Sequence, residues 1–168
     1  MARHIRFAQA SDAHAVERIE NDADQLLVDY LHADVWSAAP PGITRLSESG
    51  FLLAVDVDGE VAGFVQVLEV DGNCHLEQLS VAPAQQGLGR ALVEAAKDQA
   101  RERGYERISL RTYARVPWNA PFYATAGFAE EAPATSFHRS LLVVEAEHGL
   151  DRHGRRVQMS APLRIMHP

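Results

Sequence analysis

The first half of the chain contains short stretches in which apolar and polar residues alternate, as they do in half-buried β-strands. Four stretches have this β-prone character: residues 3–8, 51–56, 61–70 and 75–81. Asp58-Gly59 and Asp71-Gly72 separate the last three, and Asp-Gly between apolar runs is a strong signal for a tight hairpin. The pattern predicts an N-terminal strand followed by a three-stranded antiparallel meander.

Elsewhere apolar residues recur at the spacing of a helix. After a candidate N-cap at Ser11-Asp12, one such pattern covers residues 15–23 and a second covers residues 25–33. Residues 37–50 predict a loop that is followed by a short helix. Later helices are predicted at residues 88–103, 119–126 and 138–148.

Three more strands are predicted: residues 105–112, a run that begins at Phe128, and residues 156–163. The strand at 75–81, the helix at 88–103 and the strand at 105–112 have the lengths of a right-handed parallel crossover. We therefore predict a single α/β (α+β) domain over residues 1–168. It contains a mixed, mostly antiparallel sheet of about seven strands with helices on both faces.

The composition narrows the class of protein. A chain of 168 residues with 46% apolar and 23% charged residues is typical of one globular domain. No apolar run reaches the roughly 20 residues that span a bilayer, and the N-terminus has no signal-peptide core. Cys74 is the only cysteine, so no internal disulfide forms, and we interpret it as structural. We expect a soluble cytoplasmic protein that does not bind membranes.

The charge distribution bears on partners. A formal net charge of −7 disfavours broad nucleic-acid binding, which needs basic surface. Near the N-terminus, seven carboxylates between Asp12 and Asp34 accompany one basic residue, Arg18. Two interpretations stay open: a solvated helix face, or a local negative field that attracts a cationic substrate. The histidines show no tight ligand spacing, so we predict no metal site.

The segment from His75 to Leu92 carries the clearest chemistry. A strand ends there, a turn with Gly87 and Gly89 follows, and a helix starts. The glycines let backbone N–H groups point into one concavity, where the positive end of the helix also attracts anions. Arg90 adds a cation. A dinucleotide fingerprint needs glycine or alanine in place of Leu92, and the Gly-Lys-Ser/Thr of a P-loop is absent.

On these residues the chain resembles the GNAT superfamily of acyl-CoA-dependent N-acyltransferases. Gln86-Gly87-Leu88-Gly89-Arg90-Ala91 matches the family's central motif, Gln/Arg-x-x-Gly-x-Gly/Ala, and residues 79–83 look like the strand before it. Asn119, Phe122-Tyr123 and Gly127-Phe128 look like the family's second signature. The resemblance implies acetyl-CoA, or occasionally a longer acyl-CoA, as cosubstrate. It also implies a sheet splayed into a V between the fourth and fifth strands, near residues 79–83 and 109–113.

The resemblance assigns cofactor binding to two regions. The turn at residues 86–91, called the phosphate cradle below, is expected to hold the CoA diphosphate through backbone N–H groups. The edge of the strand at 79–81 is expected to pair with the pantetheine amides. Asn119 is expected to hydrogen-bond the pantetheine arm, although its position also suits an N-cap. The full set is Leu79, Val81, Gln86, Gly87, Leu88, Gly89, Arg90, Ala91, Asn119 and Phe122.

Three residues are candidates for proton transfer. Tyr123 resembles the family's general acid, which protonates the departing thiolate; its alternative is a core ring whose hydroxyl meets a carbonyl. Glu77 resembles an acidic position that some members use as a base. Strand alternation places His75 on the same face, where a coupled relay is expected if burial brings either pKa towards neutrality. The alternatives are a solvent-facing Glu77, a packed His75, and ordered water as the only base.

Together these features predict an N-acetyltransferase. It moves the acetyl group of acetyl-CoA to a primary amine of a small molecule, by direct transfer in a ternary complex. The alternatives are another acyl-CoA, a peptide or protein amine as acceptor, and a non-catalytic CoA-binding regulatory domain. Trp118 either walls the acceptor site or packs at the entry of a helix. Homodimers are common in the family, but the sequence shows no interface.

Overall fold

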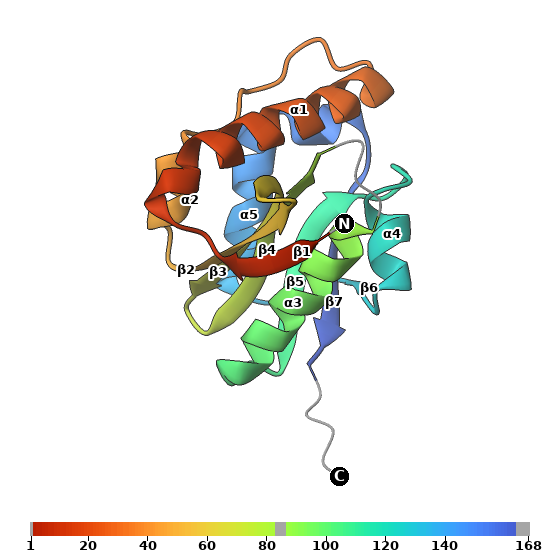
Figure 1. Ribbon diagram of the computed structural model, residues 1–168. Coiled ribbons are helices and arrows are strands. Elements are labelled where there is room, and N and C mark those ends of the chain that lie inside the picture. The colour runs from red at the N-terminus through yellow and green to blue at the C-terminus, as the bar shows by residue number, and fades with distance from the viewer. Residues whose placement is uncertain (1, 83–86, 164–168) are drawn as a thin grey trace.

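The strands form one seven-stranded sheet in the computed structural model, which describes residues 2–82 and 87–163 (Figure 1). They are β1 (Arg3–Phe7), β2 (Gly50–Val57), β3 (Glu60–Val70), β4 (Asn73–Val81), β5 (Arg107–Tyr113), β6 (Ala129–Glu131) and β7 (Arg156–Pro162). Their order is β1-β2-β3-β4-β5-β7-β6, and only the pair β4 and β5 is parallel. The predicted mixed, mostly antiparallel sheet is confirmed.

The two predicted hairpins form at their Asp-Gly turns. Asp58 and Gly59 have φ angles of 52° and 85°, and Asp71 and Gly72 have φ angles of 51° and 79°. Two successive left-handed residues make the turn that matches the right-handed twist of the strands, and Asp and Gly accept this conformation readily. The turns therefore fix the meander of β2, β3 and β4.

Helices cover both faces of the sheet: α1 (Ala13–Leu31), α2 (Gly42–Ser47), α3 (Leu88–Glu102), α4 (Ala120–Thr125) and α5 (Ser136–Glu147). Short 3-10 turns lie at η1 (Ala10–Asp12) and η2 (Leu150–His153). Figure 1 shows α3 in front of the sheet and α5 behind it. The two helical patterns predicted before residue 34 form the single helix α1, because no Gly or Pro lies between them.

Two apolar cores hold these layers together. On the α3 side, Leu88 and Leu92 pack against residues of β2, β3 and β4. On the α1 side, Val16 and Ile19 pack against Phe64 of β3. Because both faces of β2 and β3 are covered, these strands are nearly continuous apolar runs rather than strict alternations.

The sheet opens between β4 and β5. These two strands pair at two positions, His75 with Ser109 and Leu76 with Leu110, and then part. The V implied by the family resemblance is confirmed. It starts beyond the paired residues, so Ser109 and Leu110, which were expected in the opening, lie at its closed base.

A β-bulge in β4 lies at the point where the strands part. Gln66 of β3 pairs with Gln78, and the next residue, Val67, pairs with Leu76, so Glu77 is the extra residue. A bulge bends its strand and increases its twist, and bulges are frequent beside active sites. The bulge therefore accounts for the divergence of β4 from β5, and it turns Glu77 into the opening.

Candidate active site

The V holds a cavity of about 390 Å³, called the central cavity below, between β4, β5, α1 and α4. Seven of the predicted site residues line it: Glu77, Leu79, Val81, Gly89, Asn119, Phe122 and Tyr123. The wall also contains Asp24, Trp36, Arg111 and Arg156, which no motif in the sequence distinguishes. Of the other described candidates, His75, Gly87, Leu88, Arg90 and Ala91 do not line it.

The described part of the phosphate cradle is the start of α3. Gly87 precedes the helix with φ of 79°, a left-handed conformation that glycine adopts without strain. Among the described residues, no acceptor is hydrogen-bonded to the amides of Leu88, Gly89 or Arg90. The amides of a first helical turn have no acceptor within their own helix, so donors of this kind suit an anion. Gln86 lies outside the described residues.

Two predicted members of the cradle have other contacts. The amide of Ala91 donates to the carbonyl of Gly87 at 3.2 Å, so it already has an acceptor, and phosphate binding through this group stays a prediction. It is the first amide that finds an acceptor within the helix. The Leu88 side chain is 0% exposed and belongs to the core, so only its backbone faces the cradle.

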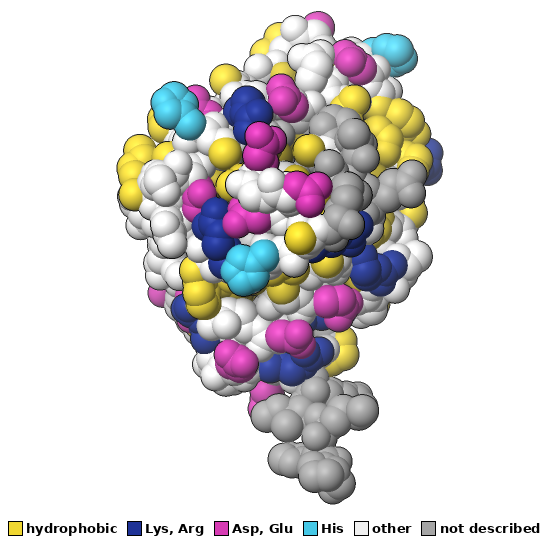
Figure 2. Space-filling view, viewed as in Figure 1, with side chains coloured by type: hydrophobic (Ala, Val, Ile, Leu, Met, Phe, Trp, Pro, Cys, Tyr) yellow, Lys and Arg dark blue, Asp and Glu magenta, His cyan; other side chains and the backbone are white. Residues whose placement is uncertain are grey.

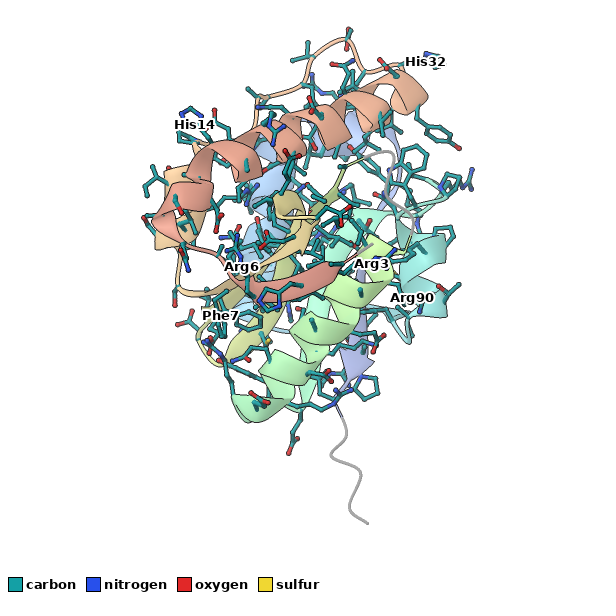
Figure 3. All side chains as sticks on the ribbon, viewed as in Figure 1. Arg3, Arg6, Phe7, His14, His32 and Arg90 are labelled. Atoms are coloured by element: carbon teal, nitrogen blue, oxygen red, sulfur yellow. The ribbon has the colours of Figure 1, made fainter. Side chains whose placement is uncertain are left out.

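Two arginines flank the cradle. Arg90, labelled in Figure 3, donates to the carbonyl of Thr125 at 2.9 Å and to its hydroxyl at 2.6 Å, so it ties α3 to α4. Arg3 of β1 was not singled out in the sequence. A Cβ atom on Gly87 would lie 3.5 Å from its Nη1 atom, which places a guanidinium beside the cradle. A residue so distant in sequence carries no local signal.

The wall of β4 and the start of α4 face each other across the central cavity. Leu79 and Val81 pair with β3 on one side, whereas β5 has left their other side. Asn119 occupies the N-cap position of α4 without capping it. Its Oδ1 instead accepts from the Thr112 hydroxyl at 2.8 Å and from the Tyr113 amide at 3.3 Å, which anchors the start of α4 on β5.

Tyr123 belongs to the core and also lines the central cavity. The residue is 8% exposed, and its ring meets Phe122 and Phe128 edge-on at 5.2 and 5.6 Å between centroids. Among the described residues, none makes a hydrogen bond to the hydroxyl, so the alternative in which it meets a backbone carbonyl is not seen. Burial raises the pKa of Tyr123, which keeps the phenol protonated.

Glu77 lines the central cavity and is open to solvent, with 36% of its side chain exposed. Burial raises the pKa of Glu77 to about 7, because the charged carboxylate loses hydration. Charged groups from other elements modify this effect: Arg45 and Arg156 lower the pKa, and Glu48 and Glu145 raise it.

His75 lies behind Glu77 and is 2% exposed. Its Nε2 atom is 3.7 Å from Oε2 of Glu77, and its Nδ1 atom is 2.8 Å from the hydroxyl of Ser109. Burial, followed by the nearby His138 and Arg111, lowers the pKa of His75 to about 3. The expected shift towards neutrality therefore holds for Glu77 and is wrong for His75, which is a neutral imidazole near pH 7.

Comparison with known proteins identifies the family of the chain. Residues 13–128, more than half of the chain, match the model of the Acetyltransferase (GNAT) family. The chain belongs to this family. It is also 36% identical to mycothiol acetyltransferase of Clavibacter sepedonicus over 104 residues, which are 57% of this chain and 34% of that protein. The match thus spans about a third of the length of that relative.

Solved structures of GNAT enzymes share the fold over nearly the whole chain. Ribosomal-protein-S18-alanine N-acetyltransferase of Escherichia coli has a TM-score of 0.68 and 24% identity, covering 99% of this chain and 97% of that one. The PaiA N-acetyltransferase of Thermoplasma acidophilum, in complex with coenzyme A, has a TM-score of 0.69 and 14% identity, covering 96% and 99%. The predicted family and fold are confirmed.

In the folded GNAT protein, the seven carboxylates between Asp12 and Asp34 have different surroundings. Asp12 pairs with Arg6 and Glu20 with Arg45, so these charges are neutralised locally. Asp24 instead lines the central cavity, where burial and then Glu20 raise its pKa to about 6. On the face seen in Figure 2, acidic and basic side chains are interspersed. These carboxylates therefore form neither a wholly solvated face nor one continuous negative field.

An ion cluster of three elements lies beside Glu77. The Glu145 carboxylate of α5 accepts from Nε of Arg111 in β5 at 2.6 Å and from Nε of Arg156 in β7 at 3.1 Å. Both arginines line the central cavity. No sequence motif joins residues of three separate elements, so the cluster is visible only in the folded chain.

Other expectations concern groups outside the central cavity. Cys74 is buried, and burial raises the pKa of its thiol to about 12, so it is not poised as a nucleophile. Within residues 2–82 and 87–163, no three His, Cys, Asp or Glu side chains are grouped to hold a metal ion. Across the same residues, no helix has both the length and the apolar character that a membrane crossing requires.

Proposed function

We propose that this protein is a single N-acetyltransferase domain that moves the acetyl group of acetyl-CoA to a primary amine of a small, cationic molecule. Transfer is direct, within a ternary complex. One observation carries the proposal: β4 and β5 part at Glu77, so the cradle, Tyr123 and Glu77 meet at the central cavity. A donor anchored at α3 and an acceptor entering past α1 would therefore share one space.

The residues around the central cavity suit coenzyme A. The amides of Leu88, Gly89 and Arg90, which have no acceptor among the described residues, offer hydrogen bonds to a diphosphate. The guanidinium of Arg3 beside Gly87 adds positive charge. Beyond the cradle, the unpaired edge of β4 at residues 79–81 offers backbone groups to the amides of the pantetheine arm. When bound, acetyl-CoA supplies an acetyl group activated as a thioester.

Glu77 acts as the base. Free amines are protonated at neutral pH and have no lone pair with which to attack. The carboxylate of Glu77 takes one proton from the ammonium nitrogen, whose lone pair then forms the bond to the acetyl carbon. A pKa of about 7 suits this step, since the group is ionised in part and still accepts a proton strongly.

Tyr123 acts as the acid. Its hydroxyl has no partner among the described residues, and it gives its proton to the sulfur as the carbon–sulfur bond breaks. The nitrogen loses a second proton when the amide is complete, and this proton restores the Tyr123 hydroxyl through solvent. One proton, the one that Glu77 accepted, is released in each turnover.

The wall opposite β4 indicates the kind of acceptor. Asp24 lines the central cavity together with Trp36 and Trp118, and the ring of Trp118 meets that of Tyr30 edge-on at 5.1 Å. A carboxylate among aromatic rings favours a cation. We therefore expect the acceptor to carry a second positive group that binds near Asp24, while its reactive amine reaches Glu77.

Thiol release from acetyl-CoA tests this function against a panel of aliphatic monoamines, diamines, amino acid amides and short peptides. We expect the highest kcat/KM with diamines. In Asp24→Asn, the KM for diamines should rise while that for monoamines stays unchanged, since only diamines have a second cation. A peptide as the best acceptor would overturn the small-molecule assignment. Coenzyme A binding without turnover on any amine would instead support a regulatory domain.

A further inference from the structure

A line of polar side chains runs from the central cavity through the sheet to α5. It starts at Glu77, whose Oε2 atom is 3.7 Å from Nε2 of His75, and continues from Nδ1 of His75 to the Ser109 hydroxyl at 2.8 Å. The same hydroxyl lies 3.0 Å from Nε2 of His138, in the first turn of α5. The last three residues are buried. A buried line of this kind needs one donor and one acceptor at each step.

The environment of His138, at the end of this line, determines which atom donates and which accepts at each step. Nδ1 of His138 is buried and has no hydrogen-bond partner among the described residues. Folded proteins leave a buried N–H without an acceptor more rarely than they leave an acceptor without a donor. Burial lowers the pKa of His138, so the ring is neutral and carries one proton. That proton is therefore on Nε2, which donates to Ser109.

Because Ser109 accepts from His138, its own hydroxyl proton is available for His75. Its hydroxyl has one proton and two acceptors within reach, Nδ1 of His75 at 2.8 Å and the carbonyl of Cys74 at 3.5 Å. Hydroxyl donors prefer acceptors at about 2.8 Å, so the proton points to Nδ1 of His75. The one proton of the neutral His75 ring is then on Nε2, the nitrogen that faces Glu77. The reverse tautomer would turn a lone pair towards the carboxylate.

We infer that Ser109 and His138 are positioning residues, which hold His75 in the tautomer that offers an N–H to the catalytic base Glu77. The inference rests on the proposed role of Glu77. Phe137 assists, because its ring meets the His75 ring edge-on at 5.4 Å and limits its rotation. At 3.7 Å the contact is longer than a hydrogen bond, and such contacts often tighten when substrate binds.

This arrangement makes His75 a donor rather than a base or a member of a relay. An N–H that faces a carboxylate favours its charged form and opposes the effect of burial on Glu77. The charged groups that act on Glu77 or His75 come from every neighbouring element: Arg45 of α2, Glu48 after it, Arg111 of β5, Glu145 of α5 and Arg156 of β7. These groups stay in place when Ser109 or His138 is changed. His138 also acts on His75, and both His138→Gln and His138→Leu remove its ring, so Ser109→Ala and the comparison of the two His138 variants isolate the effect of the tautomer.

The tautomer can be read directly by NMR, without substrate. In protein labelled with ¹⁵N-histidine, long-range ¹H–¹⁵N spectra distinguish a protonated ring nitrogen from an unprotonated one. Spectra of His75→Gln and His138→Gln assign the two rings. We expect the proton of both rings on Nε2 at pH 7, and a mixture of tautomers for His75 in Ser109→Ala. A wild-type His75 with its proton on Nδ1 would overturn the inference.

Activity provides the second test, with a matched pair of variants. His138→Gln keeps an N–H donor near the position of Nε2, whereas His138→Leu removes it at similar size. The acid limb of the kcat profile should move up by roughly half to one pH unit in His138→Leu and stay in place in His138→Gln. A limb that stays in place in both variants would contradict the inference.

Glu77→Gln separates this inference from the proposed function. If Glu77→Gln retains full turnover, Glu77 is not the base and the proposed mechanism fails. The tautomer of His75 is still settled by NMR in that case. If Glu77→Gln loses turnover and His138→Leu leaves the acid limb of the kcat profile in place, Glu77 is still the base. Only the inference about Ser109 and His138 then fails.

Discussion

Turnover should rise roughly tenfold between about pH 6 and about pH 8, because Glu77 must be ionised to accept the amine proton. With a pKa of about 7, the carboxylate is about one tenth ionised at the lower pH and about nine tenths ionised at the upper pH. The sign follows from burial: a raised pKa moves the onset of activity to higher pH than that of an ordinary glutamate. The assay is kcat from thiol release at saturating substrates, with solvent viscosity varied to show that chemistry limits the rate.

Two variants sharpen this prediction. Glu77→Gln should lose about 10²-fold to 10⁴-fold in kcat and lose the acid limb with it. Asp24→Asn is the control, because Asp24 lines the same cavity with a pKa of about 6 but is assigned to acceptor binding. It should keep the limb at about pH 7. A limb that persists in Glu77→Gln, or that disappears in Asp24→Asn, would refute the assignment of the base.

Three further predictions concern the acid, the cradle and the ion cluster. Tyr123→Phe should lower kcat by about 10²-fold or more while calorimetry shows unchanged acetyl-CoA affinity, since its hydroxyl has no partner among the described residues; unchanged kcat would remove Tyr123 from the mechanism. Gly89→Ala should still bind coenzyme A, because its Cβ would lie 3.7 Å from Phe122, which is an ordinary van der Waals contact. Gly89→Glu should abolish the calorimetric signal of coenzyme A binding, because it places negative charge in the cradle. Equal binding by both variants would exclude this anion site. Glu145→Gln leaves Arg111 and Arg156 without their buried counter-charge, so thermal unfolding should show a loss of about 3–5 kcal/mol, and a loss below about 1 kcal/mol would contradict it.

Much of the framework could be predicted from local sequence because local chemistry determines it. Asp58-Gly59 and Asp71-Gly72 define their hairpins by conformational preference alone, and the apolar stripe of residues 88–103 defines α3 by its period. The V between β4 and β5 is different. It leaves no trace in periodicity, and it was expected only because two motifs resemble those of a known family.

The candidate site was predictable only where its residues lie in motifs. Tyr123 and the cradle belong to contiguous signatures. His138 reaches Ser109 from 29 residues further along the chain, and Arg111 meets Glu145 across 34 residues. These contacts form only when α5 packs against the sheet, and this packing cannot be predicted from a single sequence. The same limitation explains why Asp24 could not be told apart from the other carboxylates of its helix.

The bulge at Glu77 shows how a shift of one residue can decide the chemistry of a strand. Strict alternation would place His75, Glu77, Leu79 and Val81 on one face of β4. In the structure, Leu79 and Val81 pack with the core under α3, whereas His75 contacts Phe137 and His138 of α5. The extra residue reverses the phase between them. It therefore lets one short strand present apolar residues to the cradle side and a carboxylate to the acceptor side of the same cavity, which a regular strand could not do.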